Sequence, residues 1–231
     1  AVQAMERLYF VSNQEMSALT TFSDISTDIP AKLKQNNYTR TAVIWDEEAD
    51  SKFVECSYVG VNAPFSPDEQ AVVWDGRVLP GISVAKNSSG NMINSTQQLN
   101  LDNRNTSYVI KTAAGDRVLG GKTAEGTWVD EMRIRDCIAA RVKERLEALL
   151  LNQAGTKVPG GSAGKVLVQS SIIAALTPFI ASDAIVEYTI NLADAIFDNK
   201  TRTLSNVQFD AILSGAILRV VVNGTLTNQE Q

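Results

Sequence analysis

The sequence contains no histidine in 231 residues, and this absence excludes more chemistry than any other feature of its composition. Without an imidazole there is no Ser-His-Asp triad, no Cys-His pair and no His-ligated zinc site. The chain also lacks the side chain that most readily exchanges protons near neutral pH. Hydrolysis by the common mechanisms is therefore not expected.

Cysteine is nearly absent as well, since only Cys56 and Cys137 occur. Two thiols cannot complete a four-cysteine metal site, and each lies in a segment of apolar periodicity. The sequence therefore predicts two free, buried cysteines, with a disulfide between them left open.

An excess of positive charge and long apolar runs are also missing. The net charge is -5, which argues against a nucleic-acid-binding surface built on net positive charge. No uninterrupted apolar run approaches the roughly 20 residues that a membrane helix needs, and residues 1–20 lack the pattern of a signal peptide. We expect a soluble protein made in a cytoplasm, with no nucleic-acid partner and no membrane insertion.

A glycine-rich turn followed by Lys122 and Thr123 invites comparison with a phosphate-binding loop. That motif needs a glycine five positions before Gly121, where this sequence has Asp116, and Gly115 is one residue out of register. The predicted helix also begins several residues beyond the Lys-Thr pair. The segment is therefore predicted to be the returning arm of a hairpin, and no cofactor is expected.

Acidic side chains cluster at Asp46, Glu47, Glu48 and Asp50, directly after residues 41–45, which read as a buried strand. Paired carboxylates can catalyse reactions, as they do in glycoside hydrolysis. An acidic loop that opens the next helix is far commoner, because negative charge suits the positive end of the helix dipole. A carboxylate-based enzyme is therefore kept only as an alternative.

The first half of the chain alternates predicted strands and helices, which is typical of an α/β layer. The predicted strands are residues 8–11 and 39–45, and the predicted helices are residues 28–35, 49–61 and 95–102. Prolines, glycines and polar residues punctuate residues 64–94, so this segment is expected to be the most exposed part of the chain.

The second half is dominated by helical periodicity. Apolar residues recur every three to four positions at Ile134, Ile138, Val142 and Leu146, which predicts one long amphipathic helix with a charged outer face. A β-hairpin precedes this helix, with arms at residues 108–112 and 117–121.

A second helix and three strands are predicted beyond it. The helix covers residues 165–181 and is expected to be interrupted near Pro178. The strands cover residues 185–191, 207–213 and 217–226, and the last two are expected to form an antiparallel pair joined at Ser214 and Gly215.

The order of these segments resembles the C-terminal half of the sheath proteins of contractile phage tails. The motifs that carry the resemblance are Asn105 with Tyr108-Val109, Gly120-Gly121 followed by Gly126-Thr127-Trp128-Val129-Asp130, Lys157-Val158-Pro159, and Ser214-Gly215-Ala216-Ile217. The resemblance covers residues 95–231 best and residues 1–94 more loosely. One departure is Pro159-Gly160-Gly161, where the family has a more polar turn.

This resemblance implies a mixed fold of the α+β and α/β kind. An outer α/β domain, residues 1–94, would precede an inner, tube-facing domain, residues 95–231, with the β-hairpin, two long helices and a terminal antiparallel strand pair. Ala1 is not an initiator Met, and family members carry more chain upstream. We therefore expect the outer domain to be truncated at its N-terminus.

The function implied by the resemblance is structural and not enzymatic. Subunits would form six-fold rings that stack helically around a tail tube, contracting to drive the tube through a bacterial envelope without a metal or cofactor. The implied partners are further copies of the chain, the tail tube protein, and the baseplate and tail terminator proteins. The chain would be found in the virion, after assembly in the host bacterial cytoplasm.

Two sets of residues are expected at subunit interfaces. A β-forming run is expected to add a strand to a neighbour's sheet: Ile217, Leu218, Arg219, Val220, Val221 and Val222. Charged residues of the long helix are expected to contact the tube or a neighbour: Arg133, Arg141 and Arg145. The alternative for the run is an ordinary strand within one subunit, and the alternative for the chain is another virion component, such as a tube or baseplate subunit.

Overall fold

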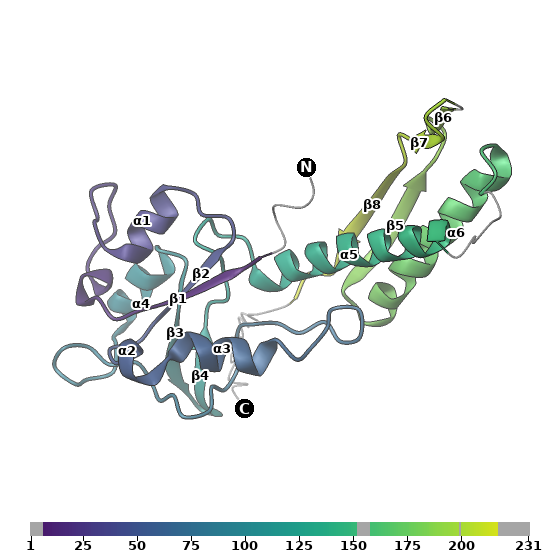
Figure 1. Cartoon of the computed structure of the whole chain (residues 1–231). Coiled ribbons are helices and arrows are strands. Elements are labelled where there is room, and N and C mark those ends of the chain that lie inside the picture. Colours follow the sequence, from purple (N-terminus) through teal and green to yellow (C-terminus); the bar gives the residue numbers. More distant parts are fainter. Residues whose placement is uncertain (1–6, 152–157, 199, 217–231) are drawn as a thin grey trace, which may run out of the picture.

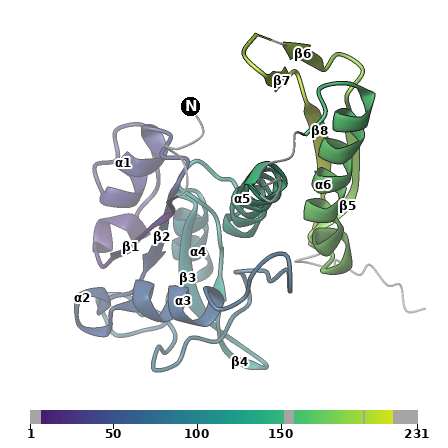
Figure 2. The ribbon, with the colours of Figure 1, turned by 45° about the vertical axis from the view of Figure 1, so that its right-hand side comes forward.

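The computed structural model describes residues 7–151, 158–198 and 200–216, which form two packed bodies joined by a long helix, α5 (Val129–Leu151) (Figure 1). The described chain is mixed α and β, with six α-helices and a mixed sheet. The first body holds a four-stranded sheet between helices. The second body packs two long helices, α5 and α6, against a two-stranded sheet. Figure 2 shows α5 end-on, between the first body and α6.

The sheet of the first body has the strand order β1-β2-β3-β4. Its strands are β1 (Tyr9–Asn13), β2 (Thr41–Trp45), β3 (Thr106–Thr112) and β4 (Gly115–Leu119). The first three are parallel, and β4 returns antiparallel to β3. Every residue of β2 is buried, as expected for a central parallel strand covered on both faces. The predicted strands and the hairpin of this half are confirmed.

Each face of this sheet has its own hydrophobic cluster, because alternate residues of a strand point to opposite faces. One cluster lies against α3 (Val54–Asn62) and includes Ala42, Ile44, Val54, Tyr58 and Trp74. The other lies against α4 (Ser95–Asp102) and the 3-10 helix η2 (Met16–Leu19) and includes Ala18, Leu19, Trp45, Leu101 and Tyr108.

Two predicted helices are confirmed, and the structure shows which residues cap them. Helix α1 (Ile29–Gln35) begins after Asp28, whose Oδ1 accepts a hydrogen bond of 3.0 Å from the Ala31 amide. Helix α4 begins after Asn94, which forms a reciprocal capping box with Gln97.

The predicted single helix over residues 49–61 is wrong at Phe53. There the chain divides into α2 (Ala49–Lys52) and α3, because Phe53 has a φ of 48° in the left-handed region. Phe53 is 60% exposed, so no core packing favours a continuous helix through it. A non-glycine residue rarely adopts this conformation, and the local sequence does not indicate it.

The expectation that residues 64–94 form the most exposed part of the chain is also wrong. Trp74, Leu79 and Ile82 are buried in the cluster that contains α3, and Ala85 and Ile93 are buried in the other. Backbone bonds join Gly76 and Arg77 to Val118, so the segment covers the outer edge of β4. The apolar residues of this segment have neither helical nor strand periodicity, so the sequence pattern does not indicate their burial. A few of them inserted into the core are enough to bury a turn-rich segment.

The second body contains α5, α6 (Ser162–Ala181), β5 (Ile185–Asn191) and β8 (Gln208–Leu213). A small hairpin, β6 (Ile196–Asp198) with β7 (Thr203–Ser205), projects from it. The predicted interruption of the second helix is wrong, because α6 continues through Pro178. This proline has no N–H to donate to the carbonyl of Ala174, but only three helical residues follow it, so the disturbance is confined to the end of the helix.

The predicted pairing of the terminal strands stays a prediction, and the structure adds a pairing that the sequence did not indicate. β8 pairs antiparallel with β5, with Tyr188 opposite Ala211. The segment 217–226, expected to be its partner, lies outside the described residues. The β6–β7 hairpin therefore lies, in sequence, between the two strands that pair.

The four-stranded sheet includes strands from both sides of residue 94, the boundary suggested by the sequence. β3 and β4 follow that residue, yet β3 pairs with β2. The change from one packed body to the other occurs within α5: Val129 belongs to the cluster beneath the sheet, whereas Ile134, Ile138 and Val142 belong to the cluster of the second body.

Helix α6 is long and apolar enough to cross a membrane by length and composition alone, with a mean hydropathy of 1.4 and 28% of its most apolar window buried. Polar side chains such as Lys165 and Gln169 interrupt its apolar residues. One face packs against α5 in the second hydrophobic cluster. A single such helix is weak support for a membrane span.

Candidate functional site

The two-stranded sheet of the second body has open edges. Within the described part of the chain, β5 pairs only with β8, and β8 only with β5. The outer side of each strand therefore presents a row of N–H and C=O groups without a ladder partner there. Such edges can accept a strand from another chain.

Helices hold this small sheet in place. Its inner face contributes Tyr188, Ile190, Phe209, Ala211 and Leu213 to a cluster with the buried side chains of α5 and α6. An isolated pair of strands is marginally stable in water, so the sheet depends on this helical support. The arrangement presents two strand edges on a fixed base.

The strand residues predicted from the sequence, Ile217–Val222, lie outside the described residues. The chain approaches them through Ser214, whose amide donates a 3.0 Å hydrogen bond to the carbonyl of Ala184. This bond holds Ser214, the residue after β8, beside Ala184, the residue before β5.

Arg133 makes its contacts within the chain. Its guanidinium donates to the carbonyls of Asn62 at 3.2 Å and Phe65 at 2.9 Å, and lies 5.3 Å from the ring centroid of Trp74. Burial lowers the pKa of Arg133 from its ordinary value. The side chain therefore ties α5 to the loop after α3, and a contact with the tube or a neighbour would have to break these bonds.

Arg141 and Arg145 are more accessible. Arg141 is 42% exposed and pairs with Asp68 at 2.6 Å and with Glu144 at 3.0 Å, and these carboxylates raise its pKa above the ordinary value. Arg145 is exposed one turn further along α5. Of the three predicted arginines, these two remain candidates for an intermolecular contact.

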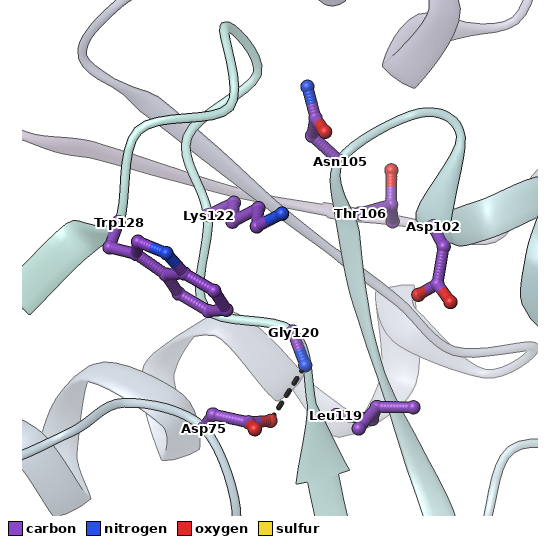
Figure 3. Close-up of a pocket in the computed structure, with 8 residues that line it drawn as sticks. All are labelled: Asp75, Asp102, Asn105, Thr106, Leu119, Gly120, Lys122 and Trp128. Carbon is purple, nitrogen blue, oxygen red and sulfur yellow. Dashed lines mark hydrogen bonds between the residues drawn. The ribbon is translucent and has the colours of Figure 1, made fainter. Parts of the chain in front are cut away.

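A pocket of about 410 Å³ lies where β3 begins and the connection from β4 to α5 passes (Figure 3). The ammonium of Lys122 lies 4.8 Å from the ring centroid of Trp128 and extends towards Asn105 and Thr106. Two carboxylates complete its walls, those of Asp75 and Asp102.

This pocket is not a phosphate loop. The Gly120 amide donates to Asp75 at 2.8 Å, and the Gly121 amide donates to the Ser107 hydroxyl at 2.9 Å, so both glycine amides are committed within the chain. Helix α5 begins only at Val129. The hairpin itself is confirmed, but β4 ends at Leu119, so residues 120–123 follow its returning arm and do not form part of it.

The acidic residues after β2 serve different contacts. Asp46 is fully buried, and its Oδ1 accepts from the Glu48 amide at 2.9 Å and from Lys52 at 3.3 Å. Glu47 accepts from the Lys86 amide, and Asp50 accepts from Gln14. Within the described residues, no group of three or more His, Cys, Asp or Glu side chains is arranged to hold a metal ion.

Burial raises the pKa of Asp46 above its ordinary value of 3.8, with Lys52 opposing this effect. A raised carboxyl pKa is a feature of many catalytic acids. Here, however, neither Asp46 nor its acidic neighbours line the pocket of Figure 3. The geometry therefore favours a structural role for this cluster.

Replacing Asp46 by Asn is expected to change how stability depends on pH. The folded chain keeps the Asp46 proton over a range just above pH 3.8 in which the unfolded chain has lost it, so this group lowers stability as pH rises through that range. Denaturant unfolding at a series of pH values should show wild type losing stability relative to Asp46→Asn. If the difference in unfolding free energy between wild type and Asp46→Asn stayed constant with rising pH, or grew in favour of wild type, the raised pKa would be contradicted.

Both cysteines are free, but the prediction that both are buried is wrong for Cys56, which is exposed on α3. Cys137 is half-buried on α5, with its Sγ 3.9 Å from Asp68. Cys56 lies away from the buried residues of α3, whereas Cys137 lies at the margin of the cluster that contains Ile134 and Ile138.

Sequence reasoning missed the loop that links the two bodies. The carbonyl of Pro67 accepts a 2.7 Å hydrogen bond from the Ser182 hydroxyl at the end of α6, and Asp68 pairs with Arg141. These partners are separated by more than seventy residues, so no local pattern marks them.

No protein-family model matches the chain, and no curated protein matches it either.

Proposed function

We propose that this chain is a structural subunit of a contractile bacteriophage tail sheath, assembling as stacked six-fold rings around a tail tube. The observation that carries the proposal is the β5–β8 sheet, which rests on two long helices and has no further strand on either edge among the described residues. The strongly β-forming Ile217–Val222 follows β8 closely in the sequence. One chain therefore offers both an acceptor for added strands and a segment suited to be one.

Strand addition suits a subunit that must stay linked while its neighbours move. Backbone hydrogen bonds supply the affinity and place little demand on side-chain identity. Links of this kind can persist while the surfaces around them repack. In the proposed sheath, Ile217–Val222 of one copy would add to the sheet of a neighbour.

Contraction in this proposal needs no cofactor or hydrolysis. The free energy would come from the difference between two packings of the same subunits, the extended one formed at assembly and the contracted one of lower free energy. Arg141 and Arg145 remain the candidates for contacts with the tail tube or with a neighbour. The sheath would also meet the baseplate and tail terminator proteins at its ends.

The alternatives are less well supported by the geometry. Tube subunits are typically smaller and dominated by β-structure, whereas the 23 residues of α5 and the 20 residues of α6 make this chain strongly helical. A carboxylate-based enzyme would need Asp46 or its acidic neighbours in a cleft, and they serve loop and helix contacts instead.

Removal of the last strand segment is expected to abolish assembly. The full chain, expressed alone and concentrated, should form hollow, helically striated cylinders in negative-stain electron microscopy at low or high salt. A chain ending at Ala216 should remain dispersed. A chain that ends at Leu226, and so keeps Ile217–Val222, is the matched control and should still assemble.

Two outcomes would count against the proposal. Persistent monomers of the full chain under all conditions would shift weight towards a binding module or an enzyme. Cylinders formed equally well by the chain ending at Ala216 would remove the last strand from subunit linkage.

A further inference from the structure

The far end of the second body carries an apolar groove of about 460 Å³. It lies between the end of α5, the start of α6 and the β6–β7 hairpin, at the tip most distant from the four-stranded sheet (Figure 1). Leu149, Leu150, Phe197 and Leu204 supply apolar walls, and Lys165 and Arg202 supply positive charge. We call this surface the tip groove.

The tip groove is both exposed and positively charged. Leu150 is 65% exposed, and Leu151 and Ile196 beside it are 77% and 60% exposed. No carboxylate is among the described residues that line the groove. Exposed apolar surface of this kind, next to charge of one sign, is typical of an interaction site.

A surface of opposite character lies on the same body. The face of the β5–β8 sheet turned away from the helices, here called the outer sheet face, carries Val186 and Ile212, which are 62% and 56% exposed. Glu187 lies directly opposite Ile212, and Asp210 is exposed on the same face. Neither β5 nor β8 contains a Lys or Arg.

We infer that the tip groove of one copy binds the outer sheet face of a second copy. Ile212 and Val186 would enter the apolar groove, and Glu187 and Asp210 would lie near Arg202 and Lys165. The inference rests on the proposed function, because it names the surfaces through which copies meet. It uses a face of the sheet and leaves both strand edges free for strand addition.

This contact is heterologous, since the two surfaces differ. A copy that offers its groove keeps its outer sheet face free for the next copy. Such a contact generates a closed ring or an open helix, depending on the rotation between copies, and does not generate a two-fold dimer. Both products are compatible with stacked rings in a sheath.

Disulfide trapping tests the contact directly. Leu150→Cys marks the groove and Ile212→Cys marks the outer sheet face, each in a chain whose Cys56 and Cys137 are replaced by Ser. Under mild oxidation, a mixture of the two variants should form a disulfide dimer containing one of each, which a mass tag on one variant identifies. Each variant alone should form few disulfide dimers.

Charge exchange gives a second and independent measurement. Arg202→Glu and Asp210→Lys should each weaken self-association in sedimentation experiments about tenfold, as opposed charges in an interface become like charges. One chain carrying both changes should regain association. Lys111→Glu, an exposed change on β3 in the first body, is the control and should have no effect.

Three results would overturn the contact. The first is that the mixture forms no mixed disulfide. The second is that each single variant cross-links to itself as readily as the mixture does. The third is that Arg202→Glu leaves the strength of self-association unchanged. Binding to phosphatidylserine vesicles that is lost in Arg202→Glu, with self-association unchanged, would assign the tip groove to a membrane surface instead. Striated cylinders without the mixed disulfide would leave the proposed function intact and remove only this contact.

Discussion

Replacing Arg104 by Met is expected to lower the free energy of unfolding by about 3–5 kcal/mol, a large part of the 5–15 kcal/mol typical of a folded domain. Arg104 is fully buried and forms a two-point ion pair with Asp28, from Nε to Oδ1 at 3.0 Å and from Nη2 to Oδ2 at 2.9 Å. Its Nη1 also donates to the carbonyls of Thr20 at 2.8 Å and Asn100 at 3.1 Å. Removing the guanidinium leaves the Asp28 carboxylate buried without its cation.

This ion pair joins parts of the first body that no strand connects. Asp28 starts α1, Thr20 follows η2 and Asn100 belongs to α4, so one side chain fixes three elements on the same face of the sheet. Loss of the pair should therefore appear in urea unfolding as a lower midpoint, and in amide exchange as faster exchange in α1 and α4.

Two further variants make the result specific to the buried charge. Adding Asp28→Asn to Arg104→Met should restore part of the stability, since the amide oxygen can still accept from the Ala31 amide and carries no charge. Lys111→Met removes an exposed cation from β3 and should change stability little. Equal losses in Arg104→Met and Lys111→Met would show that the buried pair contributes no special stability.

The elements that the sequence predicts correctly are those with local signals. Helix α4 has its capping residue Asn94 with Gln97 three positions later, and α5 has apolar residues every three to four positions. Strand β2 is a short apolar run bounded by polar residues. In each case the residues that determine the element lie within it or next to it.

The elements predicted wrongly depend on contacts distant in sequence. The left-handed conformation of Phe53 divides a helix without any glycine to signal it. Trp74 makes residues 64–94 part of the core because its ring stacks on Phe10, more than sixty positions away. The pairing of β8 with β5 was not predicted, and it too joins segments distant in sequence, across the whole β6–β7 hairpin.

At the candidate interface, too, local sequence patterns predict some features and distant contacts determine the others. Helical periodicity correctly places Arg133, Arg141 and Arg145 on the long helix, but the pattern does not distinguish a half-buried arginine bound to carbonyls from two accessible ones. The tip groove has no sequence signature, since its walls come from three separate segments. Open strand edges are likewise visible only once the pairing of β5 with β8 is known.

Replacing Phe179 by Ala is expected to destabilise the second body by about 3–5 kcal/mol, because it removes a fully buried aromatic ring from a closely packed core. Phe179 lies in the cluster formed by α5, α6 and the inner face of β5–β8. The two-stranded sheet has little stability without that cluster. Amide exchange in β5 and β8 should therefore accelerate, while β1–β4 keep their protection.

The same variant connects local stability with assembly. If β5 and β8 must be formed before a neighbour can add a strand, Phe179→Ala should lose cylinder formation at temperatures where the first body remains folded. Val166→Ala is the matched control on the same helix, because its side chain is 61% exposed and alanine favours a helix. Exchange that accelerates equally in both bodies would instead mean that α5 couples them into one cooperative unit. In that case any change that loosens the β5–β8 sheet would also loosen the four-stranded sheet, and the two bodies could not act as separate parts in the proposed contraction.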